Sequence, residues 1–213
     1  MYKQITTIFI FIFSLISICD FVGNRSFISF INNMPVYASP QEASRGTAYS
    51  HTMQAIDKHR KGDYSGAIID YTKALEIDPK YIYALHNRGV AKNMIGDYEG
   101  ALIDLNQAIK LDPQDINSYK SRAVAKDGLG DYKGAILDIN FVVNINPKDL
   151  RAIISRGQIK SKINDHSGSI KDYSRVLELD PNNKDVIYLR GVEKYKLKNY
   201  QEAIDDFNIG IIL

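Results

Sequence analysis

Three kinds of charged side chain recur along this chain at a fixed interval of 34 residues. An arginine is followed four residues later by a lysine, and an aspartate comes twelve residues after the lysine. These rows comprise Arg88, Arg122, Arg156 and Arg190; Lys58, Lys92, Lys126, Lys160 and Lys194; and Asp70, Asp104, Asp138, Asp172 and Asp206. Cationic side chains bind carboxylates strongly. The rows therefore predict either a basic strip for an acidic ligand or a ladder of internal ion pairs, and one aspartate in every interval favours the ladder.

Other chemistry is not indicated. The chain has no phosphate-binding glycine loop, no His-Glu-x-x-His motif and no Cys-x-x-Cys pair. Its four histidines lie at no metal-ligand spacing, and the single Cys19 excludes a disulfide within the chain. A net charge of +2 is small for a protein that binds nucleic acid. We therefore expect no catalytic residues, no cofactor, no metal and no nucleic-acid partner.

The 34-residue interval of the charged rows is also the period of a sequence repeat that covers residues 48–213. Gly62-Asp63-Tyr64 recurs at residues 96–98 and 130–132, and the pattern weakens at residues 164–166 and 198–200. A period of about 20–50 residues indicates stacked supersecondary units, and one of about 34 indicates pairs of antiparallel helices. The units span residues 48–81, 82–115, 116–149, 150–183 and 184–213.

Local signals agree with helix pairs. Gly62, Gly96 and Gly130 suit the left-handed conformation that often ends a helix. Each following aspartate suits the N-cap of the next helix, and Pro79, Pro113, Pro147 and Pro181 end the second helices. Small residues recur at the eighth and twentieth places, where they allow two helices to approach closely: Ala55, Gly89, Ala123, Gly157 and Gly191; Ala67, Ala101, Ala135, Ser169 and Ala203.

These positions resemble those of tetratricopeptide repeats. The segments NRGVAKNMIGDYEGALIDLNQAI and SRAVAKDGLGDYKGAILDINFVV are similar to the bacterial, especially cyanobacterial, form of the repeat. The resemblance covers residues 48–213. It implies an all-α, right-handed superhelical solenoid of five antiparallel helix pairs, with a concave groove lined by the first helix of each pair.

The resemblance also implies a function, that of a non-catalytic scaffold or adaptor whose groove binds a peptide or helix of a partner protein. An assembly or chaperone-like factor for a membrane complex is the alternative. The carboxylate clamp of chaperone-binding members is not expected, because only Asn87 matches it. The candidate groove residues are Tyr49, Ile56, Tyr83, His86, Val90, Lys120, Val124, Arg151, Gln158, Tyr188, Val192 and Tyr195.

The N-terminal part differs from the repeats. Residues 5–19 form an apolar run after Lys3, which is typical of a secretory signal, and Val36-Tyr37-Ala38 fits its cleavage site. An uncleaved anchor is the other interpretation, since residues 5–22 are just long enough to span a bilayer. We expect residues 1–38 to be one or the other, residues 39–47 to be a linker, and the protein to be exported to a periplasm, lumen or extracellular space, or membrane-anchored.

The C-terminal unit is four residues shorter than the others. Repeat arrays usually end in an element with a polar outer face, whereas this sequence stops at Ile209-Gly210-Ile211-Ile212-Leu213. Phe207, Ile211 and Ile212 are therefore candidates to line an uncapped face. We expect this face to dock on a second copy, a membrane surface or a partner's helix, and self-association is the simplest of these.

Overall fold

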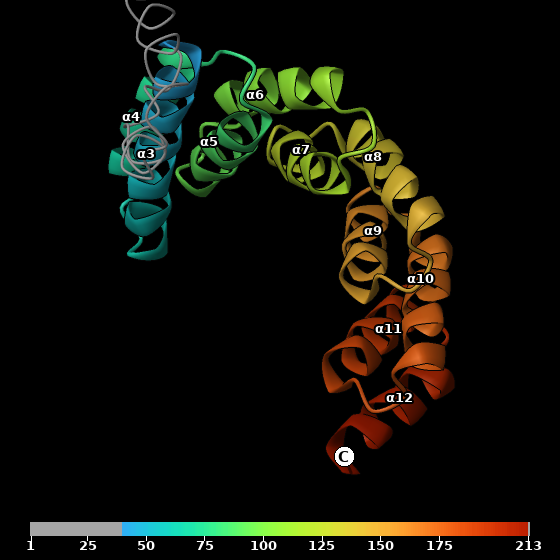
Figure 1. Cartoon of the computed structure of the whole chain (residues 1–213). Coiled ribbons are helices and arrows are strands. Elements are labelled where there is room, and N and C mark those ends of the chain that lie inside the picture. Colours follow the sequence, from blue (N-terminus) through green and yellow to red (C-terminus); the bar gives the residue numbers. More distant parts are fainter. Residues whose placement is uncertain (1–39, 213) are drawn as a thin grey trace, which may run out of the picture. The chain divides into compact units, whose positions relative to one another are not determined.

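The computed structural model describes the backbone of residues 40–212 and the side chains of residues 46–212. This part contains ten helices and no strand, as the repeat pattern predicted (Figure 1). The helices are α3 (Pro40–Arg60), α4 (Tyr64–Ile77), α5 (Ile82–Met94), α6 (Tyr98–Leu111), α7 (Ile116–Gly128), α8 (Tyr132–Ile145), α9 (Leu150–Lys162), α10 (His166–Leu179), α11 (Lys184–Lys196) and α12 (Tyr200–Ile212). Among them, none has the length and apolar character needed to cross a bilayer. The predicted leader and its cleavage site lie outside the described residues.

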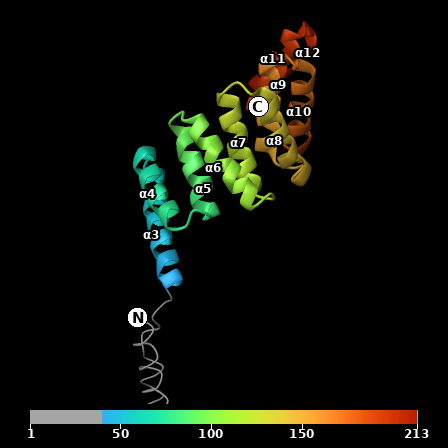
Figure 2. The same ribbon diagram turned by 90° about the horizontal axis from the view of Figure 1, so that it is seen from above.

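The helices pack in sequence order within the unit Glu42–Leu213. The second helix of each pair contacts the first helix of the next, from α4–α5 to α10–α11. Figure 1 shows α7 and α9 along the inner side of a curve, with α8 and α10 along the outer side. Figure 2 shows the pairs following one another from α3–α4 to α11–α12. This arrangement is the predicted helical solenoid, and it places the first helices side by side on one face.

The turn between the helices of each pair has the predicted conformation. Gly62, Gly96 and Gly130 have φ values of 79–81°, a left-handed conformation that is strained for residues with a Cβ atom. The next residue is an aspartate whose carboxylate accepts a hydrogen bond from the amide three residues later, for example Asp131 Oδ1 from Gly134 N at 2.9 Å. Asn164 and Lys198 occupy the glycine position in the last two units with φ of 61° and 65°. The geometry is thus kept where the glycine is absent.

The first helix is longer than we predicted. It begins at Pro40, so that residues 40–47, for which we expected a linker, are helical. Proline suits the first position of a helix, where its missing N–H loses no hydrogen bond. Good helix formers, such as Gln41, Glu42 and Ala43, follow it. The repeat pattern could not reveal this extension, because residues 40–47 precede the first repeat.

The core consists of small residues that face large ones across each pair. Ala101 and Leu105 in α6 are fully buried. Gly89 in α5 lies so close to α6 that a Cβ there would be 2.7 Å from Leu105 Cγ. In the last pair, Phe207 packs in the same way against Gly191 of α11. Phe207 therefore packs within its own pair and stays partly exposed.

One junction between pairs is charged where the others are apolar. Tyr98 packs against Ala125 of the next pair, whereas His166 at the equivalent place contacts Glu193, with Nδ1 and Oε2 2.6 Å apart. Glu193 also accepts hydrogen bonds from Ser161 and Lys196, both at 2.8 Å. Burial by itself raises the pKa of Glu193, but these hydrogen bonds outweigh it and lower the pKa below its usual value.

Candidate functional site

The charged rows form ion pairs inside each helix pair. Asp138 in α8 accepts hydrogen bonds from Arg122 Nε to Oδ2 at 2.8 Å and from Nη2 to Oδ1 at 2.7 Å, and Lys126 Nζ lies 2.9 Å from Oδ2. The same arginine and lysine positions contact the aspartate in the other three complete sets, and Lys58 pairs with Asp70 in the first unit. The five aspartate side chains are 1–5% exposed. The rows are therefore the predicted ladder.

Each arginine also joins its pair to the preceding one. Arg122 Nη1 donates to Asn106 of the preceding repeat at 2.8 Å. Arg88, Arg156 and Arg190 donate in the same way to Thr72, Asn140 and Ser174. Each guanidinium group is hydrogen-bonded both to the aspartate of its own helix pair and to a polar side chain of the preceding repeat. The arginines therefore do not form a free basic strip for an acidic ligand.

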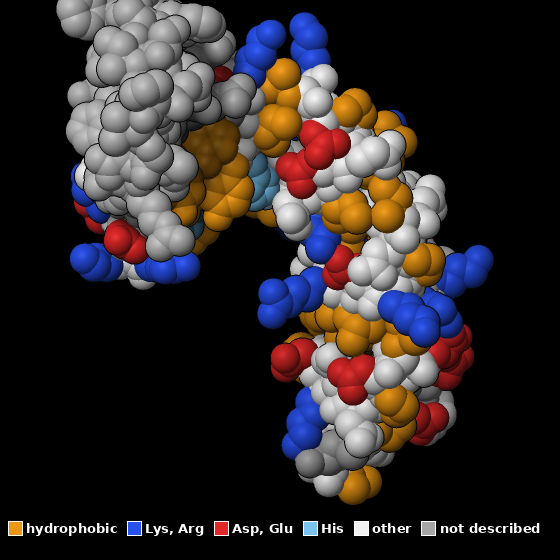
Figure 3. Space-filling view, viewed as in Figure 1, with side chains coloured by type: hydrophobic (Ala, Val, Ile, Leu, Met, Phe, Trp, Pro, Cys, Tyr) orange, Lys and Arg blue, Asp and Glu red, His pale blue; other side chains and the backbone are white. Residues whose placement is uncertain are grey.

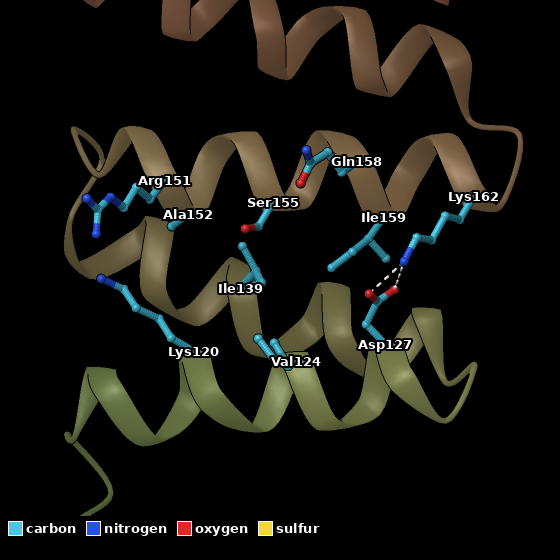
Figure 4. Close-up of a pocket in the computed structure, with 11 residues that line it drawn as sticks. Lys120, Val124, Asp127, Ile139, Arg151, Ala152, Ser155, Gln158, Ile159 and Lys162 are labelled. Atoms are coloured by element: carbon cyan, nitrogen blue, oxygen red, sulfur yellow. Dashed lines mark hydrogen bonds and ion pairs between the residues drawn. The ribbon is translucent and has the colours of Figure 1, made fainter. Parts of the chain in front are cut away.

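The first helices line a cavity between α7 and α9 (Figure 4). We call it the Val124 cavity; its volume is about 490 Å³. It is lined by Lys120, Ala123, Val124, Asp127, Ile139, Arg151, Ala152, Ser155, Gln158, Ile159 and Lys162. Lys120, Val124, Arg151 and Gln158 were predicted as groove residues, and the structure brings these four together. Val124, Ile139 and Ile159 give it an apolar middle (Figure 4).

The two ends of the Val124 cavity differ in charge balance. At one end, Lys162 Nζ bridges from α9 to both carboxylate oxygens of Asp127 in α7, at 2.7 and 2.6 Å. At the other end lie Lys120 and Arg151 (Figure 4). Lys120 pairs with Asp149, whereas Arg151 is exposed and has no ion pair with any residue in 46–212. This end therefore carries one positive charge that the described residues leave unneutralised.

A second cavity lies at the start of α5 and α7. We call it the His86 cavity; its volume is about 700 Å³. It is lined by Asp78, Lys80, Tyr81, Ile82, Tyr83, His86, Asn87, Asp115 and Asn117. Of these residues, Tyr83 and His86 were predicted. The other polar groups come largely from the connections before α5 and α7, which the groove positions of the resemblance do not include, so the sequence analysis missed them.

Comparison with known proteins agrees with this geometry. The family model described as TPR repeat matches residues 58–93, and the one described as Tetratricopeptide repeat matches residues 82–115 and 150–183. The protein is a tetratricopeptide-repeat protein. A search of curated protein sequences found no match to this tetratricopeptide-repeat protein.

Solved tetratricopeptide-repeat structures have the same fold. A MamA protein superposes with a TM-score of 0.72 at 22% identity, over 78% of this chain and 90% of that chain. MamA from Desulfovibrio magneticus RS-1 gives 0.74 at 19% identity, over 78% and 94%. YrrB, described as a TPR protein with an unusual peptide-binding site, gives 0.67 at 20% identity, over 77% and 84%. At these identities the likeness shows the fold alone.

The remaining predicted groove residues of the tetratricopeptide array lie outside both cavities. Tyr49, Tyr188 and Tyr195 are 56–60% exposed. Ile56 packs against the core of the first pairs, and Val90 and Val192 are half-buried. Figure 3 shows exposed hydrophobic side chains interspersed with charged ones on the viewed face. The predicted residues are thus distributed along the array, and six of the twelve line one of these two cavities.

Proposed function

We propose that this protein is a non-catalytic scaffold whose groove binds a peptide or helix of a partner protein. The observation that carries this proposal is the Val124 cavity on the first helices. Its volume of about 490 Å³ falls within the range of about 300–1,000 Å³ for ligand pockets. Its apolar middle and polar ends have the pattern of a recognition surface, in which apolar contacts give affinity and polar ones specificity.

The lining of the cavity suggests the chemistry of its occupant. Val124 is 55% exposed, and it faces Ile139 and Ile159, so that an aliphatic side chain would bury apolar surface there. Arg151 adds a positive charge that the described residues do not neutralise. We infer that the bound segment carries an aliphatic residue next to an acidic one. The description of the similarly folded YrrB as peptide-binding supports a peptide as the occupant.

Selection from a displayed peptide library with the immobilised full-length protein tests this proposal. Peptides selected by the wild type should bind Val124→Glu and Arg151→Glu at least about tenfold more weakly, because each change opposes an acidic, aliphatic ligand. Leu137→Glu is the matched control, since Leu137 lies on α8, is 69% exposed and lines neither cavity. If no peptide is selected, or if Leu137→Glu weakens binding as much as Val124→Glu, the proposal is wrong.

We also propose that the protein is exported or membrane-attached through its N-terminal residues. The support is the sequence alone, an apolar run after a lysine followed by a small-residue cleavage pattern. Cell fractionation and mass spectrometry of the mature N-terminus test it. A chain that begins at Ser39 supports a cleaved signal, and an intact Met1 in the membrane fraction supports an anchor. A full-length chain in the soluble cytoplasmic fraction would contradict both.

A further inference from the structure

His86 is held in a single hydrogen-bonding state at the wall of the His86 cavity. Ser118 Oγ donates its only hydrogen to Asp115 Oδ2 at 2.5 Å, because a carboxylate can only accept. The same oxygen lies 3.1 Å from His86 Nδ1, so Nδ1 must be the donor of that contact. Ser118 is fully buried, so that water does not compete for this chain of hydrogen bonds. The geometry therefore assigns the proton of the imidazole to Nδ1.

The other imidazole nitrogen is left as an acceptor. Burial lowers the pKa of His86, an effect that the nearby Asp115 only partly opposes, so the ring is neutral at pH 7. A neutral ring with its proton on Nδ1 has a lone pair on Nε2. Among the residues in 46–212, no group donates to Nε2, since the contact to Ser118 is the only hydrogen bond of this ring.

The charges and rings around His86 favour a cation. Asp78 and Asp115 accept hydrogen bonds from the amides of Lys80 and Asn117, at 3.1 Å each. Neither carboxylate forms an ion pair with a residue in the described part of the chain. Lys80 is the only cationic side chain in the lining. Two carboxylates and one ammonium group therefore leave one negative charge of the lining unbalanced.

Aromatic surface completes this lining. The rings of Tyr81 and Tyr83 lie side by side, with centroids 6.4 Å apart and planes tilted by 38°. Tyr83 is 52% exposed, so that part of its ring surface is accessible to a ligand. A cation that lies over such a ring is attracted by its electron-rich face. The lining thus offers an imidazole acceptor, carboxylates and an open aromatic ring, which no described group uses together.

We propose that the His86 cavity binds an arginine side chain of the partner segment, which rests on the proposed function of the groove. A guanidinium group has five donors in a plane and stacks on aromatic rings, so it can contact Tyr83 while donating to His86 Nε2 and to a carboxylate. Lysine, with a compact ammonium, would make fewer of these contacts at once. The positive end of the Val124 cavity has the opposite preference, so the two cavities together fix the direction in which the segment lies.

The test uses N-acetyl-arginine amide as the probe and the full-length protein in detergent micelles. The imidazole carbon-bound proton signals of the four histidines are followed by NMR and assigned with His86→Gln. We expect a saturable shift of the His86 signal with arginine. N-acetyl-citrulline amide, which has the same shape without the charge, should bind about tenfold more weakly. Asp78→Asn should weaken arginine binding severalfold, whereas Leu137→Glu, at an exposed position outside both cavities, should leave it unchanged.

The outcomes separate this inference from the proposed function. If the His86 signal does not shift, if citrulline binds as well as arginine, or if Asp78→Asn has no effect, the arginine site is wrong. The groove can still bind a segment in that case, because the library selection tests the Val124 cavity independently. If arginine binds at His86 and no peptide is ever selected, the arginine site stands and the scaffold function fails. Circular dichroism of each variant checks that the helices are retained.

Discussion

Replacing Asp138 by asparagine should strongly destabilise the protein. The change keeps the size of the side chain and removes its charge, while Arg122 and Lys126 remain beside it. Their side chains are 17% and 20% exposed, and that of Asp138 is 5% exposed. Removal of one partner from a buried ion pair costs about 3–5 kcal/mol. Because water still reaches the two cations in part, we expect the lower end, about 3 kcal/mol.

Thermal unfolding followed by circular dichroism measures this cost. A domain of about 150–250 residues loses about 2–4 °C of melting temperature per kcal/mol, so Asp138→Asn should melt about 6–12 °C lower than the wild type. Glu178→Gln is the matched control. Glu178 pairs with Arg175 on the surface, where its side chain is 63% exposed, and such a pair contributes about 0–1 kcal/mol.

Either of two results would refute this reasoning. If Asp138→Asn destabilises no more than Glu178→Gln, the buried carboxylate does not hold the helix pair together. If the deficit disappears at about 1 M salt, the pair behaves as an exposed one, because salt screens buried charges much less. The apolar combination Asp138→Leu, Arg122→Met and Lys126→Met should recover most of the stability, since no unpaired charge remains buried.

Three more predictions concern packing, backbone strain and pH. Ala101→Leu should destabilise the protein by about 1–3 kcal/mol in urea unfolding, because Ala101 is fully buried between helices. Ile103→Ala on the same helix is the control and should have almost no effect, because Ile103 is 68% exposed. Lys198→Gly should raise the melting temperature, because the φ of 65° at Lys198 costs about 1–2 kcal/mol for a residue with a side chain; an unchanged or lower melting temperature would show that this strain is negligible. Glu193→Gln should lower stability mainly above about pH 4.5, the region of the pKa of an unfolded glutamate. The folded-state pKa of Glu193 is lower than that value, so its stabilisation is present above the unfolded pKa and is lost as pH falls through the folded pKa. Denaturation curves from pH 3 to pH 7 should therefore converge on the acid side, and a gap that stays constant over this range would contradict the assignment.

The sequence could predict the candidate site only in part. Lys120, Val124, Arg151 and Gln158 occupy regular places on first helices, so their common face follows from the repeat period, and they line the Val124 cavity. The His86 cavity depends on Asp78 and Tyr81 from a connection. The path of a connection depends on the helices at both of its ends, and a pattern of helix positions does not include it. The orientation of His86 likewise depends on Ser118, which lies 32 residues away.

The sequence by itself determined the number and order of the helices from α4 to α12 and the turn within each pair, because period, glycine turns, aspartate caps and prolines act over a few residues. It left open whether the charged rows bind a ligand or each other. Only the tertiary structure decided this, since Arg122 and Asp138 lie on different helices, 16 residues apart, and the distance between their charges depends on how closely the two helices pack. Small residues such as Gly89 and Ala101 set that packing, and it places each carboxylate within hydrogen-bonding distance of its arginine.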